Sequence, residues 1–117
     1  MLRITNGRGF QLVFANGWTV SIQFGPGNYC ENRDMEFGQS SDEYNASQRK
    51  AGEQGCGTAE IAAWPWQGEL VSFGGDTVKG WVNANEVAAF IALVANLPEG
   101  ELPNTAFAQL YDAATKK

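Results

Sequence analysis

Residues 10–24, with the sequence FQLVFANGWTVSIQF, decide the expected fold. Apolar and polar residues alternate in 10–14 and again in 18–24, which is the pattern of strands with one buried face. Asn16 and Gly17 lie between the two runs, and this dipeptide readily supplies both positive φ angles of a type I′ turn. We therefore predict an N-terminal hairpin with one apolar and one polar face.

Three further strands are expected after the hairpin. They span residues 58–66, 69–73 and 77–82, and the first two end at glycine-containing turns. Together with the hairpin they form a mainly antiparallel sheet of about five strands.

Two helices are expected to follow the sheet. Asn83 with Glu86 three residues later fits a capping box, and Pro98 ends the helix that begins there. The second helix is predicted to begin near Asn104 or Thr105. A run of strands followed by two C-terminal helices makes the fold class α+β.

The length and composition predict one folded domain over residues 1–117. The chain is 44% hydrophobic and 18% charged, as is usual for folded proteins. Residues 31–57 are the exception, because this long stretch is polar and carries few apolar side chains. Such loops are either functional or mobile, so this one is a candidate to cover a site or to reach a second subunit.

The charge and residue types restrict the possible functions. A net charge of −5 argues against a nucleic-acid polymer as partner. The chain contains no histidine, which is the usual acid/base near neutral pH and a common metal ligand. We therefore expect no catalytic residues, no metal, no cofactor and no enzymatic activity. We also expect no membrane span and, because residues 1–6 lack the apolar core of a signal peptide, a cytoplasmic location.

The two cysteines, Cys30 and Cys56, cannot complete a zinc site without histidine. A disulfide between them would close the polar loop, whereas a reducing compartment favours two thiols.

The segment 25–30, GPGNYC, is the first candidate site. Its glycines could turn consecutive amides toward an anion, and the guanidinium of Arg33 suits a phosphate. On chemical grounds we add Asn28, Tyr29 and Arg8 to this site. The alternative is a tight turn that leaves the strand, and no established phosphate-binding motif is present.

The segment 73–77, FGGDT, is the second candidate site. Phe73 offers a ring face for a base, Asp76 could accept from a ribose hydroxyl, and Lys79 and Asn83 follow at the far end of the same segment. A hairpin turn explains the glycines and Asp76 equally well.

The tryptophans divide into two groups. Trp64 and Trp66 flank a proline, which confines a strand to a sheet edge, so they could form an interface or belong to the core. Trp18 and Trp81 are assigned mostly to the core.

Residues 16–30, NGWTVSIQFGPGNYC, and 73–81, FGGDTVKGW, resemble segments of small bacteriophage-encoded proteins, the first Thoeris anti-defence family. The resemblance implies a protein of the infected bacterial host's cytoplasm that sequesters a cyclic ADP-ribose isomer without cleaving it. It also implies possible binding of cyclic oligonucleotides and assembly into dimers or dimer-based hexamers. Within this resemblance, Phe73 and Asn83 match ligand-contact positions.

Two functions from different classes follow. In the first, the chain captures a cyclic nucleotide. With only four arginines and four lysines it is sparsely equipped for a diphosphate, which favours a site shared between subunits of a homo-oligomer. In the second, it is a protein–protein inhibitor of a host defence enzyme, with the polar loop and residues 64–66 as the contact surface.

Overall fold

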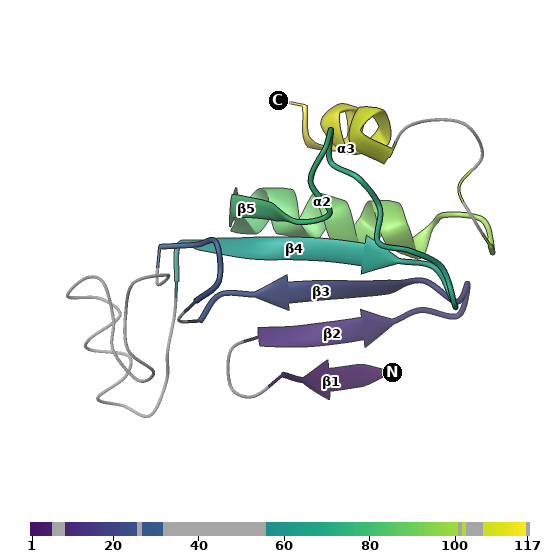
Figure 1. Cartoon of the computed structure of the whole chain (residues 1–117), viewed down its shortest axis with the longest axis horizontal. Coiled ribbons are helices and arrows are strands. Elements are labelled where there is room, and N and C mark those ends of the chain that lie inside the picture. Colours follow the sequence, from purple (N-terminus) through teal and green to yellow (C-terminus); the bar gives the residue numbers. More distant parts are fainter. Residues whose placement is uncertain (6–8, 26, 32–55, 101, 103–106, 117) are drawn as a thin grey trace.

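The computed structural model describes residues 1–5, 9–25, 27–31, 56–100, 102 and 107–116. Five strands form one antiparallel sheet in sequence order, with each strand hydrogen-bonded to the next. The predicted α+β class, with a five-stranded antiparallel sheet and two helices, is confirmed (Figure 1). The elements are β1 (Leu2–Ile4), β2 (Gly9–Val13), β3 (Thr19–Gln23), β4 (Thr58–Trp64), β5 (Lys79–Asn83), α2 (Ala84–Ala95) and α3 (Phe107–Thr115).

The predicted hairpin is β2–β3, but its turn differs from the prediction. The amide of Gly17 donates to the carbonyl of Phe14 at 3.0 Å, and the amide of Phe14 donates to Trp18 at 2.9 Å. Gly17 has a φ of 85°, whereas Asn16 is not among the described non-glycine residues with positive φ. The loop is therefore a three-residue turn that ends in a left-handed glycine, and not type I′.

The side chain of Asn16 joins the hairpin to the end of α2. Its Nδ2 group donates to the carbonyls of Val94 and Leu97, both at 2.9 Å. Trp18, next to the turn, donates from its indole to the carbonyl of Pro98 at 3.0 Å. These bonds hold the hairpin against the C-terminal end of α2 and the residues that follow it.

The segments that form the sheet differ in part from the predicted ones. Residues 2–4 form an edge strand that the short N-terminal pattern did not indicate. Residues 69–73 are not a regular strand, although the amide of Val71 donates to Ala63 at 2.9 Å. β4 ends at Trp64, two residues early, because the chain turns at Pro65 and the amide of Gly68 donates to the Pro65 carbonyl.

The first predicted helix is confirmed, with its cap. The Asn83 side chain accepts a hydrogen bond from the amide of Glu86 at 2.9 Å, and α2 ends before Pro98. The predicted start of the second helix at residues 104–105 lies outside the described residues, and α3 is described from Phe107.

The two helices pack against each other, and one of them covers the sheet. α2 lies against β3, β4 and β5, and α3 packs on α2 (Figure 1). Strand register places Phe10, Ile22 and Ile61 side by side on the same face, and Ile22 and Ile61 are buried. Phe90 and Val94 of α2, both fully buried, complete this core.

The polar stretch 31–57 lies outside the described residues except at its ends. Cys30 is buried and Cys56 is half-buried, and both are thiols, as the reducing-compartment argument favoured.

Candidate functional site

The main irregularity of the sheet is a bulge in β5. Ala59 of β4 pairs with Val82 and Ile61 pairs with Lys79, so two residues of β5 oppose one of β4. One of those two, Trp81, has a φ of 52°. A bulky side chain rarely adopts this left-handed conformation, and such outliers concentrate at functional sites. Bulges also redirect side chains, and Trp81 is 56% exposed.

Trp81 stacks on Tyr29, and we call this pair the aromatic platform. The ring centroids are 5.8 Å apart and the planes differ by 28°. The backbones are joined as well, because the amide of Trp81 donates to the carbonyl of Tyr29 at 2.8 Å. Gly80 permits this approach, since a Cβ there would lie 2.5 Å from the Tyr29 Cβ atom.

Glu60 fixes the loop that carries Tyr29. Its Oε2 atom accepts from the Tyr29 amide at 3.1 Å, and its Oε1 atom accepts from the Asn28 side chain at 3.4 Å. Each carboxylate oxygen can accept more than one hydrogen bond, so Glu60 retains capacity for a donor on a ligand.

The chemistry of the aromatic platform suits an uncharged planar group. A base stacked on an aromatic side chain gains about 1–3 kcal/mol. The contacts described around the pair include a carboxylate and an amide. The platform therefore suits a base or another flat ring with N–H donors.

Of the first predicted site, the structure brings Asn28 and Tyr29 to the aromatic platform. Arg8 and Arg33 lie outside the described residues. Gly25 and Asn28 are bonded to each other, because the Asn28 amide donates to the Gly25 carbonyl and the Gly25 amide donates to the Asn28 side chain. The described amides of Gly25 and Asn28 are thus engaged in these two bonds and do not face an anion, which supports the tight-turn alternative.

Of the second predicted site, Phe73 lies in an aromatic cluster formed with α2 and α3. Its ring meets those of Phe107 and Tyr111 edge-on, with centroids 5.3 and 5.4 Å away, and lies 6.1 Å from Phe90. Phe73 is half-buried and packs on the hydrophobic core. It therefore has a structural role in addition to any contact with a ligand.

No described side-chain contact joins Asp76 or Asn83 to that aromatic cluster. Asp76 is exposed in a turn where its carbonyl accepts from the Phe73 amide at 2.7 Å. Gly74 and Gly75 have φ values of 87° and 130° with open space beside them, so they serve the turn. The Asn83 oxygen caps α2, and its Nδ2 donors have no described bond.

β5 nevertheless joins the two regions. Lys79, at its start, places its ammonium 5.7 Å from the ring centroid of Tyr111 in the aromatic cluster. Trp81, two residues later, belongs to the aromatic platform. Burial raises the pKa of Tyr111 from 10.0 to about 12, and the nearby carboxylates of Glu86 and Asp112 add to the shift.

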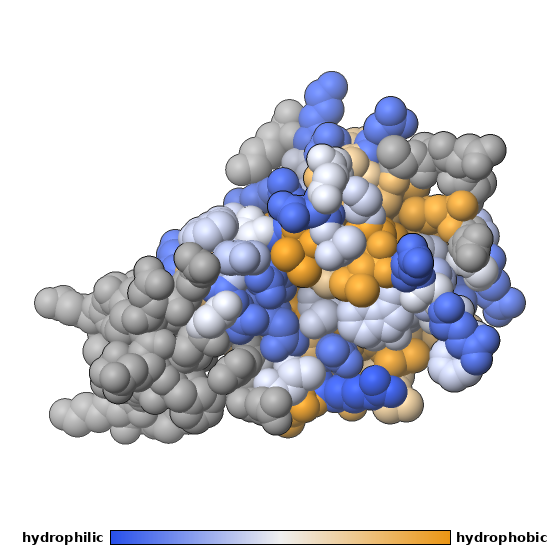
Figure 2. Space-filling model, viewed as in Figure 1, coloured by the Kyte–Doolittle hydropathy of each residue, from blue (hydrophilic) through white to orange (hydrophobic). Residues whose placement is uncertain are grey.

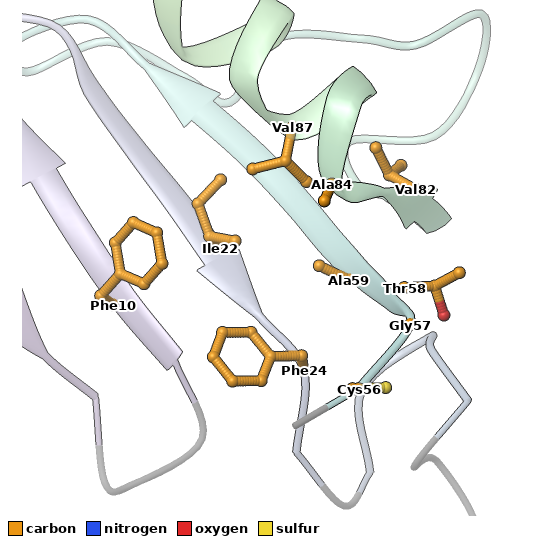
Figure 3. A pocket seen from close by; sticks show the side chains of 10 residues that line it. All are labelled: Phe10, Ile22, Phe24, Cys56, Gly57, Thr58, Ala59, Val82, Ala84 and Val87. Carbon is orange, nitrogen blue, oxygen red and sulfur yellow. The ribbon is translucent and has the colours of Figure 1, made fainter. Parts of the chain in front are cut away.

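An apolar pocket of about 340 Å³ lies elsewhere, between the sheet and the start of α2 (Figure 3). Its walls include Phe10, Ile22, Phe24 and Val87, and the Cys56 thiol lies at one side. None of the predicted site residues lines it. The few polar groups around it do not suit nucleotide recognition.

The sequence analysis missed Trp81 as a site residue, and its assignment to the core is wrong. Trp18 is buried at 1% exposure, as predicted, but Trp81 is not. The available signal was Gly80, because an isolated glycine inside a strand pattern indicates a bulge or a close backbone approach. Trp64 is half-buried, which fits the core alternative in part. Trp66 is 76% exposed, which fits the interface alternative.

On the face seen in Figure 2, a hydrophobic area in the described part of the chain is bordered by hydrophilic residues. Within the described part of the chain, no three acidic or cysteine side chains are placed to hold a metal. Neither described helix has the length and apolar composition needed to cross a bilayer. No family model, curated protein or solved structure matches the chain.

Proposed function

We propose that this protein binds a nucleotide by stacking its base on the aromatic platform, and that it holds the ligand without cleaving it. The observation that carries the proposal is the exposed Trp81 ring, held at a φ of 52° and stacked on Tyr29. A bulky residue in this conformation costs about 1–2 kcal/mol, which needs a compensating reason. Presenting a ring face to a ligand is such a reason.

The particular ligand we propose is a cyclic ADP-ribose isomer that acts as an immune signal. The proposal rests on the resemblance to the first Thoeris anti-defence family, in which Phe73 and Asn83 match ligand-contact positions. The protein would then act in the cytoplasm of an infected bacterium and suppress the defence by sequestration. Lys79 lies on β5 between Phe73 and Trp81 in the sequence and could serve a phosphate.

Affinity arithmetic supports a shared site. Submicromolar capture needs more than about 8 kcal/mol, and one stacked base supplies about 1–3 kcal/mol. The rest must come from phosphate and ribose contacts, yet Arg3, Lys79 and Lys116 are the only arginine and lysine residues of the described part. Arg8, Arg33 or residues of a second subunit would supply the remainder, so we propose a homo-oligomer, a dimer or dimer-based hexamer.

The test is calorimetric binding of cyclic ADP-ribose and of the product of a bacterial TIR enzyme, followed by release of the ligand on denaturation. We expect tight binding and recovery of intact ligand. Trp81→Gly removes the ring while relieving the left-handed strain, so we expect affinity to fall by about 1–3 kcal/mol with little change in stability.

The matched control is Trp66→Ala, which removes another exposed indole outside the aromatic platform. It should leave affinity unchanged. Equal binding by wild type and Trp81→Gly would remove the platform from the site, and steady turnover of the ligand would contradict sequestration.

Trp66 favours a second candidate function, inhibition of a host enzyme through a protein contact. Its ring is 76% exposed and Leu70 nearby in the sequence is 44% exposed. In that case the purified protein would release no small molecule, and Trp66→Ala rather than Trp81→Gly would abolish the activity.

A further inference from the structure

The Tyr111 hydroxyl is buried without a hydrogen-bond partner in the described structure. The residue is only 2% exposed. Buried donors of this kind are rare in folded proteins because they lose their bonds to water without replacing them, so each one requires an explanation. A group that is unpaired in the ligand-free protein can be paired in the complex.

The surroundings of Tyr111 connect it with the second predicted site. Its ring contacts that of Phe73 edge-on, with centroids 5.4 Å apart, and the Lys79 ammonium lies 5.7 Å from its centroid. A ligand that reaches Phe73 would thus arrive beside Tyr111.

The charges around Tyr111 define what it can bind. Lys79 of β5 faces its ring, whereas Glu86 of α2 and Asp112 of α3 act on it as negative charges. The phenol is protonated near neutral pH and can donate, and its pKa, raised to about 12, reflects surroundings that disfavour a negative charge there. The two carboxylates disfavour an anionic oxygen at the hydroxyl, so an uncharged acceptor fits better than a phosphate.

We propose that Tyr111 is a ligand-binding residue whose hydroxyl donates to an uncharged acceptor on the nucleoside part of the captured nucleotide, such as a ring nitrogen or a ribose oxygen. This inference rests on the proposed function and assigns it a residue that selects for the nucleoside. Because the hydroxyl is covered here, entry of the ligand requires α3 and the segment that carries Phe73 to separate locally.

The experiment compares wild type with Tyr111→Phe, using cyclic ADP-ribose and the bacterial TIR product as probes. Removing an unpaired hydroxyl should leave the thermal midpoint of the ligand-free protein equal or higher, while affinity falls by about three- to tenfold. A purely structural role does not predict a more stable variant that binds more weakly. Pyrophosphate, which lacks the nucleoside, should bind both proteins equally, however weakly.

Unchanged affinity for the probes would overturn the inference, whatever the stability does. A fall in both stability and affinity would overturn it too, because the hydroxyl would then have a partner in the ligand-free protein. Should wild type bind neither probe, the proposed function fails together with this inference. Should wild type bind and Tyr111→Phe bind equally well, only this inference fails.

Discussion

Phe73 illustrates at the scale of one residue how a single ring can serve both core and site. The ring touches those of Phe90, Phe107 and Tyr111, and the residue is half-buried. The sequence analysis treated it as a ligand contact. The packing instead predicts a cost in stability, so binding and folding must be measured separately.

We expect Phe73→Ala to destabilise the protein by about 3 kcal/mol, the low end of the range for a buried phenylalanine because the ring is only half-buried. Phe73→Leu keeps most of the apolar volume and should cost about 1 kcal/mol. Denaturant unfolding measures both losses. If Phe73 also contacts the ligand, Phe73→Leu will bind cyclic ADP-ribose more weakly while remaining folded, and full binding by that variant would limit the residue to packing.

At the scale of elements, the bulge in β5 and the loop that carries Tyr29 depend on each other. The Tyr29 backbone lies so close to β5 that position 80 has no room for a side chain. The two segments are also joined by the bond between the Trp81 amide and the Tyr29 carbonyl. The aromatic platform is therefore a property of two segments, and neither forms it alone.

We expect Gly80→Ala to separate these segments, because its Cβ atom would lie 2.5 Å from Tyr29 Cβ and 2.9 Å from Tyr29 O. Ligand affinity, measured by calorimetry, should fall to the level of Trp81→Gly. Gly74→Ala is the matched control: its φ is 87° with open space beside it, so it should cost about 1 kcal/mol of stability and spare the platform. Equal effects on binding would show that general destabilisation is responsible.

Local patterns made much of the fold predictable. Alternation identified β2 and β3, the strand expected over 58–66 contains β4, and the pairing of Asn83 with Glu86 located the start of α2. β1 has only three residues, too few for a pattern. Residues 69–73 have strand-like composition, but the turn after Pro65 changes their course.

The candidate site was only partly predictable. Asn28 and Tyr29 were identified from their chemistry, and the structure brings them to the aromatic platform. Trp81 was not, because the left-handed backbone that exposes it arises from pairing with β4, which is distant in the sequence. The unpaired hydroxyl of Tyr111 follows from tertiary packing that no local pattern encodes.

At the scale of the whole molecule, alkaline stability depends on Tyr111. Its folded pKa is about 12 against an ordinary value of 10.0, so the folded state favours the protonated phenol. The stabilisation of the folded state that this pKa difference provides is fully present below pH 10. It is lost as the pH rises from about 10 toward 12. Unfolding free energy should fall in that window, and Tyr111→Phe should show a smaller fall.

Absorbance titration near 295 nm gives an independent check, since one of the three tyrosines should ionise late in the folded protein and normally after denaturation. A single tyrosine transition at the ordinary pKa in the folded protein would contradict the burial described for Tyr111.

The exposed indole of Trp81 has a practical consequence, because it gives the protein an intrinsic optical reporter. Its emission depends on the water around a ring that is 56% exposed, whereas Trp18, at 1%, is shielded from solvent. With Trp66 replaced by phenylalanine, the solvent-sensitive part of the fluorescence would come from Trp81 and, to a smaller extent, from the half-buried Trp64. Binding of a ligand could then be followed in real time and without a label, by quenching or a blue shift of the tryptophan emission.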